Sequence, residues 1–209
     1  MPKRTIFYVD GLNFYHGLKQ LKLRKYYWLN YLELANKLLN HDEILVKIKY
    51  FTTIVKKFYD PSKHGRQINY ISALRTLDKN KFQIIFGKHQ ENYRICKNCN
   101  YQMPDFKEKR TDVSIASEIF RDSYNKKCDV IKLISADSDY IPICKTVLDL
   151  FPNIEIEILF SPGRKSGELK KLCHRCVDIF VSTIAQSQFP DPVVNSILNL
   201  SYSKPPYWN

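Results

Sequence analysis

Short apolar runs alternate along this chain with segments in which apolar residues recur every three or four positions. The runs are rich in β-branched and aromatic residues and predict buried strands, whereas the periodic segments predict amphipathic helices. The predicted strands are residues 5–9, 44–53, 82–86, 130–135, 154–160 and 177–181. The predicted helices are residues 12–23, 31–39, 67–77, 112–124, 140–150 and 167–172. This alternation predicts an α/β fold, in which a parallel sheet carries helices on both faces as three layers, α/β/α.

The alternation predicts one domain over residues 1–185, with an interruption and a tail. Residues 88–109 are polar and predict an excursion from the core fold. Residues 186–209 contain several prolines and show no period, so we interpret them as a C-terminal tail. The candidates for docking this tail onto the domain are its aromatic residues Tyr202, Tyr207 and Trp208.

The chain carries a large excess of positive charge. Its 209 residues include 33 lysines and arginines against 21 aspartates and glutamates, a formal net charge of +12. Because cations that neutralise phosphates also release counterions, this excess favours a nucleic-acid partner over a merely basic, soluble surface. Two of the cations, Lys47 and Lys49, interrupt the apolar run 44–53 and predict that one face of this strand is less buried.

The distribution of apolar residues also bears on the compartment. No apolar stretch approaches the roughly 20 residues needed to span a bilayer, and the first apolar run ends at Asp10, too early for the core of a signal peptide. We therefore expect a cytoplasmic protein with no membrane partner. In a reducing cytoplasm, metal binding or burial of the six cysteines is expected to outcompete disulfide formation. The oligomeric state, including a homo-oligomer, is left open.

Acidic residues follow two of the predicted strands at the point where each strand ends. Asp10 directly follows the first strand, and Asp137 and Asp139 closely follow strand 130–135. Ligands of open parallel sheets bind at the carboxyl ends of the strands, so these carboxylates are expected to converge if the two strands are neighbours. Asp112 opens a helix and joins them only if the excursion before it returns the chain to the same edge.

Such a group of carboxylates predicts a divalent metal site. Converging carboxylates repel one another unless a hard cation neutralises them, and oxygen ligands suit Mg²⁺ or Mn²⁺. Each of Asp10, Asp112 and Asp139 taken alone is more typical of a helix cap or an acid in a first helical turn. Several of them at one edge of a sheet favour the metal site instead.

Three motifs around these acids resemble those of a known family. Tyr8–Asn13 resembles the Asp-x-x-Asn opening of LabA-like NYN domains, Glu108–Val113 resembles their Lys-Gly-x-Asp-Val motif, and Leu133–Tyr140 resembles their Ser-Gly-Asp-Ser-Asp-Phe motif. The motifs occur in the family's order, and the resemblance extends over residues 4–182. In this chain Arg110 stands where the family often has glycine, and Ala136 replaces the glycine before Asp137.

The resemblance implies a PIN-like fold with strand order 3-2-1-4-5 and, where activity is seen, metal-dependent cleavage of RNA. The implied catalytic and metal-binding acids are Asp10, Asp112, Asp137 and Asp139, with Mg²⁺ or Mn²⁺ as the ion. Asn13 and Ser135 are the nearby polar positions and are expected to bind the substrate. Lys109 and Arg110 are candidates for holding the substrate phosphate or, equally, part of a solvated face.

The expected chemistry is hydrolysis of an RNA phosphodiester. Bound divalent ions lower the pKa of water and clamp the scissile phosphate, which predicts 5′-phosphate and 3′-hydroxyl products because no 2′-hydroxyl attack is needed. A catalytically silent RNA-binding or regulatory module and a DNA-directed nuclease are the alternatives.

Two further patterns are open to more than one interpretation. Cys96-x-x-Cys99 and Cys173-x-x-Cys176 have the spacing of two zinc half-sites, but the second pair equally suits small core residues. Cys128 and Cys144 are interpreted as core residues. Residues 22–28 and 56–59 mix cations with aromatic residues, as platforms for single-stranded RNA do, although such aromatics more often serve core packing.

Overall fold

The computed structural model describes residues 1–96, 98–196 and 198–209, and gives only the backbone of residues 89–94 and 103–109. Its six-stranded sheet is parallel throughout and has the order β3-β2-β1-β6-β7-β8. The strands are β1 (Lys3–Asp10), β2 (Glu43–Thr52), β3 (Phe82–Phe86), β6 (Val130–Ile134), β7 (Glu155–Phe160) and β8 (Arg175–Asp178). In sheet-strand numbering this is 3-2-1-4-5-6, which confirms the predicted α/β fold and order, with a sixth strand beside the fifth.

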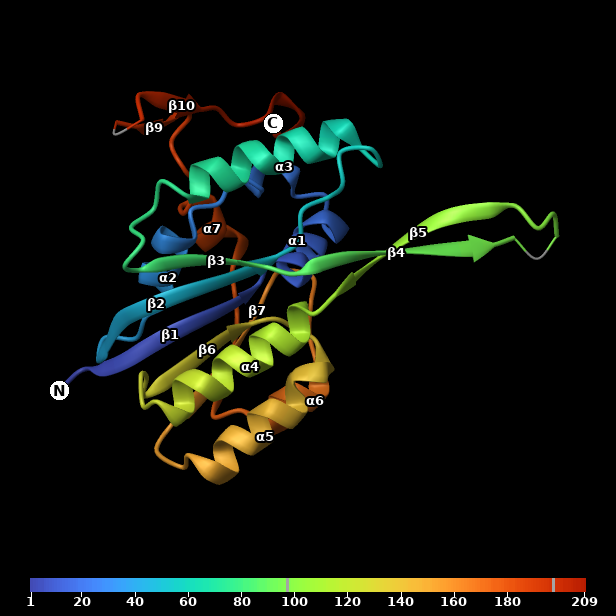
Figure 1. The fold of residues 1–209 in the computed structure, drawn as a ribbon. Helices are drawn as coiled ribbons and strands as arrows, with labels where there is room; N and C mark the ends of the chain where they lie inside the picture. The colour runs from blue at the N-terminus through green and yellow to red at the C-terminus, as the bar shows by residue number, and fades with distance from the viewer. Residues whose placement is uncertain (97, 197) are drawn as a thin grey trace.

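Helices cover both faces of the sheet and enclose two separate apolar clusters. Helices α1, α2, α3 and α7 pack in the first cluster and α4, α5 and α6 in the second. Figure 1 shows α3 on one side of the sheet and α4 and α5 on the other. The bounds are α1 (Gly11–Gln20), α2 (Tyr31–Leu38), α3 (Pro61–Leu74), α4 (Thr111–Tyr124), α5 (Ile141–Leu150), α6 (Gly167–Leu172) and α7 (Val181–Ala185). Short 3₁₀ helices are η1 (Arg24–Tyr26), η2 (Ser138–Tyr140) and η3 (Pro206–Trp208).

Most predicted elements lie within a few residues of the observed ones, and α3 shows the largest shift. It begins at Pro61, six residues before the predicted start, because Asp60 caps it by accepting a hydrogen bond from the Lys63 backbone N–H at 2.7 Å. Proline in the first turn of a helix has no N–H to leave unsatisfied. The first turn of α3 is polar and has no apolar periodicity, so the sequence pattern did not predict it as helix.

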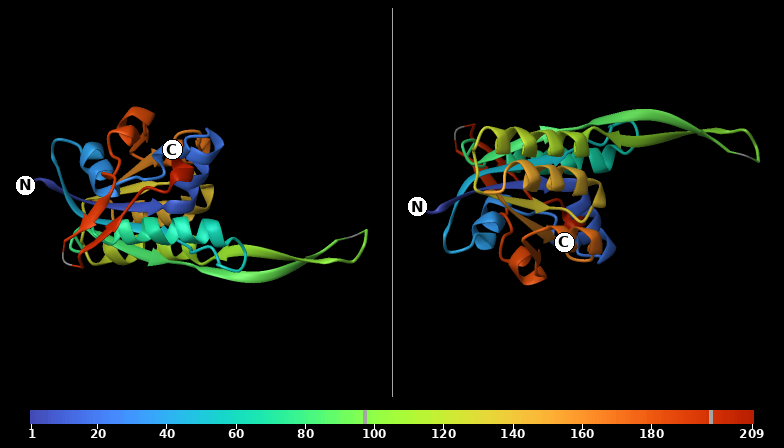
Figure 2. Two further views of the ribbon diagram at one scale, coloured as in Figure 1. Left: turned by 90° about the horizontal axis from the view of Figure 1, so that it is seen from above. Right: turned by 90° about the horizontal axis from the view of Figure 1, so that it is seen from below.

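The predicted excursion is a two-stranded antiparallel arm of β4 (Lys88–Ile95) and β5 (Gln102–Lys109). Lys88 pairs with Lys109 at its root, and Ile95 pairs with Gln102 near its tip. Both views in Figure 2 show the arm projecting away from the domain. Because β5 returns to the root, α4 begins at the same edge of the sheet at which β3 ends (Figure 1).

The prediction that strand 44–53 has a less buried face is wrong at Lys49, which is 6% exposed. Its ammonium group donates hydrogen bonds to Glu118, at 2.6 Å, and to Asp122, which is completely buried. The hydroxyl of Tyr8 donates to the same Asp122 carboxylate at 2.7 Å. A buried lysine is tolerated here because paired carboxylates neutralise it, which a hydropathy pattern does not reveal.

The C-terminal segment packs against the domain. It forms a small hairpin of β9 (Val193–Asn195) and β10 (Leu200–Tyr202) and ends in η3. Trp208 is 8% exposed, and its ring lies 5.7 Å from Tyr27 and 5.8 Å from Tyr70, measured between centroids. The tail is therefore part of the first apolar cluster. No helix in the described part of the chain is long and apolar enough to cross a membrane.

Candidate active site at the carboxyl edge of the sheet

Asp10 lies at the point where β1 passes into α1. It is 5% exposed and is the N-cap of α1, because its Oδ1 accepts a hydrogen bond from the Asn13 backbone N–H at 2.9 Å. The next residue must be small, since a Cβ on Gly11 would lie 2.6 Å from the Phe51 carbonyl oxygen. The capping role expected for this aspartate is present, but it uses only one of its two carboxylate oxygens.

The second oxygen of Asp10 meets Asp112 through a shared tyrosine. The buried hydroxyl of Tyr140 lies 3.1 Å from Asp10 Oδ2 and 2.9 Å from Asp112 Oδ1. A phenol has one hydrogen and can donate it to one carboxylate at a time. Two acids far apart in the sequence are thus held against a single proton donor.

The electrostatics of Asp10 and Tyr140 follow from their burial, whereas Asp112 is exposed. Burial raises the pKa of the Asp10 carboxyl and the charge of Asp112 raises it further, while hydrogen bonds from Asn13, Tyr140 and Ser135 oppose the shift. Burial also raises the pKa of the Tyr140 hydroxyl well above its usual range, with the two carboxylates adding to the effect. Tyr140 is therefore a neutral donor at physiological pH.

Polar side chains tie the loop after β6 to the end of β1. The Ser135 hydroxyl donates to Asp10 Oδ2 at 3.1 Å and accepts from the Asp137 backbone N–H at 3.2 Å. The Ala136 N–H donates to the side-chain oxygen of Asn13 at 3.2 Å. Parallel pairing of Val9 with Ile134 aligns the two strand ends, which is why these contacts form.

Asp137 and Asp139 occupy this loop differently. Asp137 is partly buried, and its carboxylate accepts a hydrogen bond from the Asp139 backbone N–H at 3.0 Å, capping η2. Asp139 is exposed. The structure thus links the backbone N–H of Asp137, rather than its carboxylate, to Asp10 through Ser135. It likewise brings the backbone of Asp139, rather than its carboxylate, to Asp137.

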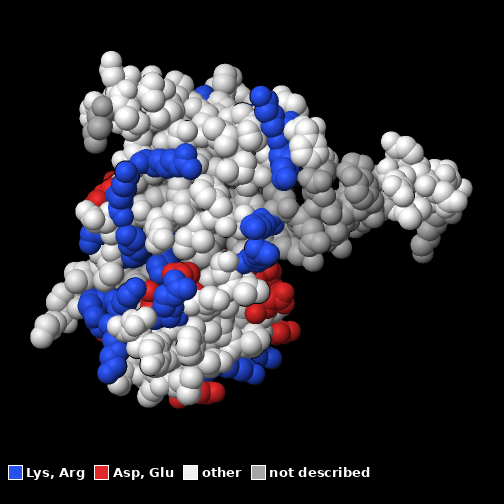
Figure 3. All heavy atoms as spheres, viewed as in Figure 1, with Lys and Arg blue, Asp and Glu red and all other residues white. Residues whose placement is uncertain are grey.

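These contacts assemble part of the acidic group expected from the sequence. Asp10 and Asp112 meet at one hydroxyl, but the described residues contain no group of three or more histidine, cysteine, aspartate or glutamate side chains arranged to hold a metal ion. The carboxylate oxygens of the pair are nevertheless the donors that a hard cation prefers. Figure 3 shows acidic side chains gathered near the root of the arm, with basic ones next to them.

The basic positions before Asp112 lie at the junction of the arm and α4. Arg110 is exposed and precedes α4 in the left-handed conformation, with φ of 78°. Its carbonyl oxygen accepts the Ser114 N–H at 2.8 Å and so begins the helix. The side chain of Lys109, the other candidate phosphate contact, lies outside the described residues.

The four cysteines of the suggested zinc site are not brought together. Cys96 and Cys99 lie at the tip of the arm, whereas Cys173 and Cys176, next to α6 and in β8, form a disulfide with each other. A zinc ion shared by the two pairs does not fit this arrangement, because the antiparallel pairing of β4 and β5 carries one pair away from the sheet. The disulfide also differs from the expectation that all six cysteines are reduced. Cys128 and Cys144 are buried, as predicted.

Tyr140 was missed in the sequence reasoning, although a signal for it was present. It stands where the family motif has phenylalanine, and the difference between the two residues is the hydroxyl that joins Asp10 to Asp112. A polar group at an expected apolar position, next to an acidic motif, is the feature that points to it.

A parallel sheet with carboxylates at its carboxyl edge defines a class of α/β proteins to which the PIN-like nucleases belong. Comparison with family models supports this class of proteins and identifies one family within it, because residues 4–181 match the NYN domain. The chain belongs to the NYN domain family, within the PIN-like superfamily, whose members are generally nuclease-like and generally use divalent metals.

Two individual proteins are also similar to the chain. It is 28% identical over 178 residues to a Pseudomonas putida (strain DSM 28022 / S16) protein named 6-hydroxy-3-succinoylpyridine 3-monooxygenase HspA, covering 70% of this chain and 56% of that relative. A crystal structure of a protein of unknown function from Vibrio parahaemolyticus RIMD 2210633 matches with a TM-score of 0.54 and 17% identity, over 86% of this chain and 94% of the other. The latter likeness shows the fold alone.

Proposed function

We propose that this protein is a metal-dependent ribonuclease that hydrolyses RNA phosphodiesters at a site formed by Asp10, Asp112, Asp137 and Asp139, with Mg²⁺ or Mn²⁺ as the ion. The observation that carries the proposal is the approach of Asp10 and Asp112 to one tyrosine hydroxyl at the carboxyl edge of a NYN-family sheet.

The chemistry of this pair supports a cation. Tyr140 can donate to one of the two carboxylates at a time, so the other faces a hydroxyl oxygen without a hydrogen. Asp10 is buried whereas Asp112 is exposed, and a negative charge on Asp10 this close to that of Asp112 is unfavourable unless a proton or a positive ion neutralises it. A bound divalent ion supplies this charge, lowers the pKa of water and stabilises charge on the phosphate.

The residues of the site then have distinct roles. Asp10 and Asp137 would hold the ion directly, and Asp112 and Asp139 would hold it directly or through water, one of them orienting the nucleophile. Asn13 and Ser135 fix the loop that carries Asp137 to the end of β1. Lys109 and Arg110 would contact the phosphate from the start of α4.

RNA is the favoured substrate because of the net charge of +12 and the family of the chain. Phosphate contacts alone do not distinguish RNA from DNA, and a silent RNA-binding module would use the same surface. The oxygenase named for the Pseudomonas putida relative is a second candidate, supported by the similarity over 178 residues. That relative is considerably longer, however, since the match spans 56% of it.

The test is a cleavage assay on matched single-stranded RNA and DNA oligonucleotides with Mn²⁺, Mg²⁺ or EDTA. We expect RNA cleavage with either metal, 5′-phosphate products and no cleavage in EDTA. Asp137→Asn should reduce the rate by about 100-fold or more. The matched control is Asp149→Asn, the same change at an exposed position of α5, which should cleave at the wild-type rate.

Four results would contradict the proposal in different ways. Cleavage that persists in EDTA would exclude the metal, and preference for DNA would exclude the ribonuclease. RNA binding without turnover would identify a silent module. Oxygen consumption with 6-hydroxy-3-succinoylpyridine and a reductant, in the absence of any RNA cleavage, would favour the oxygenase.

A further inference from the structure

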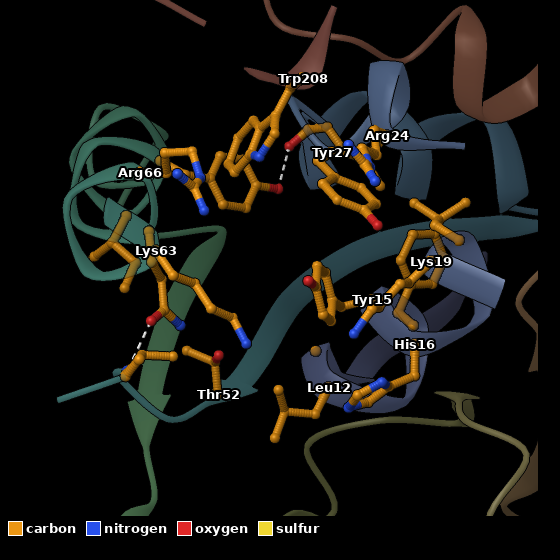
Figure 4. Close-up of a pocket in the computed structure, with 18 of the residues that line it drawn as sticks. Leu12, Tyr15, His16, Lys19, Arg24, Tyr27, Thr52, Lys63, Arg66 and Trp208 are labelled. Atoms are coloured by element: carbon orange, nitrogen blue, oxygen red, sulfur yellow. Dashed lines mark hydrogen bonds between the residues drawn. The ribbon is translucent and has the colours of Figure 1, made fainter. Parts of the chain in front are cut away.

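A cavity of about 720 Å³ lies between α1 and α3, beside the candidate active site. We call it the α1–α3 pocket. Gly11 and Leu12, the two residues directly after Asp10, line it, so the cavity begins where the acidic site ends. The last residues of the chain, Tyr207 and Trp208, line it as well. Figure 4 shows side chains from these separate elements facing a common space.

The charge of this pocket is strongly one-sided. Among the described residues its lining includes one carboxylate, that of Asp60, one oxygen of which caps α3. The lining also contains six cationic side chains, Lys19, Lys22, Arg24, Lys56, Lys63 and Arg66. Such a group of like charges around one cavity is unfavourable in the absence of an anion.

Three of these cations, Lys19, Lys63 and Arg66, lie close enough to influence one another electrostatically. Figure 4 shows the amino groups of Lys19 and Lys63 directed into the cavity from α1 and α3. Partial burial lowers the pKa of the Lys63 ammonium group, and the positive charges of Lys19 and Arg66 lower it further, against the opposing effect of Asp60. The Lys63 ammonium group also lies 5.7 Å from the centre of the Tyr15 ring.

Aromatic rings form another part of the wall. The rings of Tyr15 and Tyr27 lie 5.0 Å apart, and Tyr27 packs edge-on against Trp208 at 5.7 Å. Tyr207 is 54% exposed, and the guanidinium groups of Arg24 and Arg66 lie 4.7 Å and 4.5 Å from its ring centre. Cations beside aromatic faces are the combination with which proteins bind single-stranded nucleic acids.

From this geometry we propose that the α1–α3 pocket binds nucleotides of the single-stranded RNA substrate next to the scissile bond. Phosphates contact Lys19, Lys63 and Arg66, and a base packs against the aromatic wall. Tyr207 is a positioning residue that holds Arg24 and Arg66 at the pocket. The inference rests on the proposed function for the identity of the strand, but it concerns binding and can be tested without cleavage.

An anionic aromatic ligand suits this pocket better than an apolar one. An apolar molecule would supply no counter-charge to Lys19, Lys63 and Arg66, whereas the phosphates of a strand supply it and release counterions. Tyr207 and Trp208 lie beyond residues 4–181, the part of the chain that matches the NYN domain. One wall of the pocket is therefore supplied by the C-terminal segment, outside the matched domain.

The test measures binding of a fluorescent single-stranded RNA in EDTA, by anisotropy at several salt concentrations. Lys63→Ala combined with Arg66→Ala should weaken binding by about 10-fold or more and reduce the slope of log affinity against log salt by about 1.4, for two lost phosphate contacts. The control is Lys145→Ala combined with Lys171→Ala, which removes two exposed charges from α5 and α6, in the other helical layer. It should retain wild-type binding within about twofold.

Tyr207 gives a second and gentler test. Tyr207→Ala should weaken RNA binding by about fivefold through the loss of two cation–π contacts, whereas Tyr207→Phe, which keeps the ring, should bind as wild type. Equal binding by the wild type and both pocket variants would overturn the proposal. So would displacement experiments in which adenosine monophosphate occupies the pocket while RNA still binds, because the ligand would then be a free nucleotide.

The same measurements separate this proposal from the proposed function. Asp137→Asn should bind RNA in EDTA at least as tightly as the wild type, because it removes a negative charge near the scissile phosphate, and it should fail to cleave RNA with Mn²⁺. If that variant cleaves normally, the acidic site is misassigned, while the binding data still decide the pocket. If the pocket variants bind RNA normally but the acidic variants lose cleavage, only the pocket is excluded. Melting curves of every variant establish that each one is folded.

Discussion

Tyr140 is the residue on which the candidate active site depends in the absence of metal. Its hydroxyl is completely buried and lies within 3.1 Å of carboxylate oxygens from Asp10 and Asp112. A hydrogen bond to a charged group contributes about 1.5–3 kcal/mol, more than a neutral one. The hydroxyl therefore supplies part of the stabilisation that a cation would give to the two carboxylates. The free-energy cost of removing this hydroxyl should then depend on whether metal is bound.

We expect Tyr140→Phe to lower the stability of the metal-free protein by about 1.5–3 kcal/mol. Saturating Mn²⁺ should reduce this loss, because the ion takes over the neutralisation of Asp10 and Asp112. Melting curves with EDTA and with Mn²⁺ measure both quantities. Tyr8→Phe is the matched control, since it removes another buried hydroxyl that donates to a carboxylate, and its loss should not respond to Mn²⁺. A deficit in Tyr140→Phe that Mn²⁺ leaves unchanged would argue against a metal at this pair.

Asp137→Asn tests the acidic site by removing a negative charge, whereas Tyr140→Phe removes a hydrogen-bond donor. If the acids form a metal site, they repel one another when it is empty, so removing one charge should leave the metal-free melting temperature unchanged or raise it, by about 1 kcal/mol of stability. The amide oxygen can still accept the Asp139 N–H, which preserves the cap of η2. The variant should also lose most of its stabilisation by Mn²⁺. If Asp137 were only a cap, the metal response would be unchanged.

At the scale of elements, the arm decides where α4 begins. The pairing of Lys88 with Lys109 returns the chain to the edge of the sheet, and Arg110 turns it into the helix with φ of 78°. The left-handed region costs a residue with a side chain about 1–2 kcal/mol, whereas glycine adopts it freely. Arg110 therefore carries a strain that glycine at this position would avoid.

Arg110→Gly should stabilise the protein by about 0.5–1 kcal/mol, after allowance for the greater flexibility of glycine in the unfolded chain. If Arg110 holds the substrate phosphate, the same variant should cleave RNA about 10-fold more slowly. Denaturant unfolding and the cleavage assay measure the two effects. Arg110→Ala, which loses the charge but keeps a Cβ, should cleave as slowly without the gain in stability. Wild-type cleavage by both variants would assign Arg110 to the solvated surface.

For the whole molecule, two apolar clusters on opposite faces of the sheet contain buried titratable groups. Burial raises the pKa of the thiols of Cys128 and Cys144 to about 12, from an ordinary value of 9.0. The folded chain thus keeps both thiols protonated at a pH at which the unfolded chain has released these protons. The free energy of unfolding therefore falls as the pH rises from 9 towards 12, because the folded state binds more protons than the unfolded state.

Cys144→Ala should make this alkaline loss shallower by about 1.4 kcal/mol per pH unit between pH 9 and 12. At neutral pH the variant should be less stable than wild type by about 1 kcal/mol, because it leaves a small cavity. Val147→Ala, which truncates another buried side chain of α5, should lower stability by a similar amount at every pH and leave the alkaline slope unchanged. Parallel pH curves for Cys144→Ala and wild type would contradict the prediction.

The sequence by itself determined the layered α/β fold and two of the places where acids stand. Whether a strand or one face of a helix is buried can be inferred from the spacing of apolar residues within that segment. The six strands and the ends of β1 and β6 could therefore be predicted. Because all strands of a parallel sheet end at one edge, Asp10 and Asp137 could be assigned to that edge from this pattern, whereas the pattern did not show that β1 and β6 are neighbours.

Only the tertiary structure decided what depends on contacts between distant segments. The register of β4 with β5 brings Asp112 back to the edge and carries Cys96 and Cys99 away from the other cysteine pair. The burial of Trp208 and the basic lining of the α1–α3 pocket arise in the same way, from segments that share no local period. A hydrophobic pattern predicts whether a residue is buried but not which residue it contacts. The contacts of each of these side chains depend on how distant segments of the chain pack together.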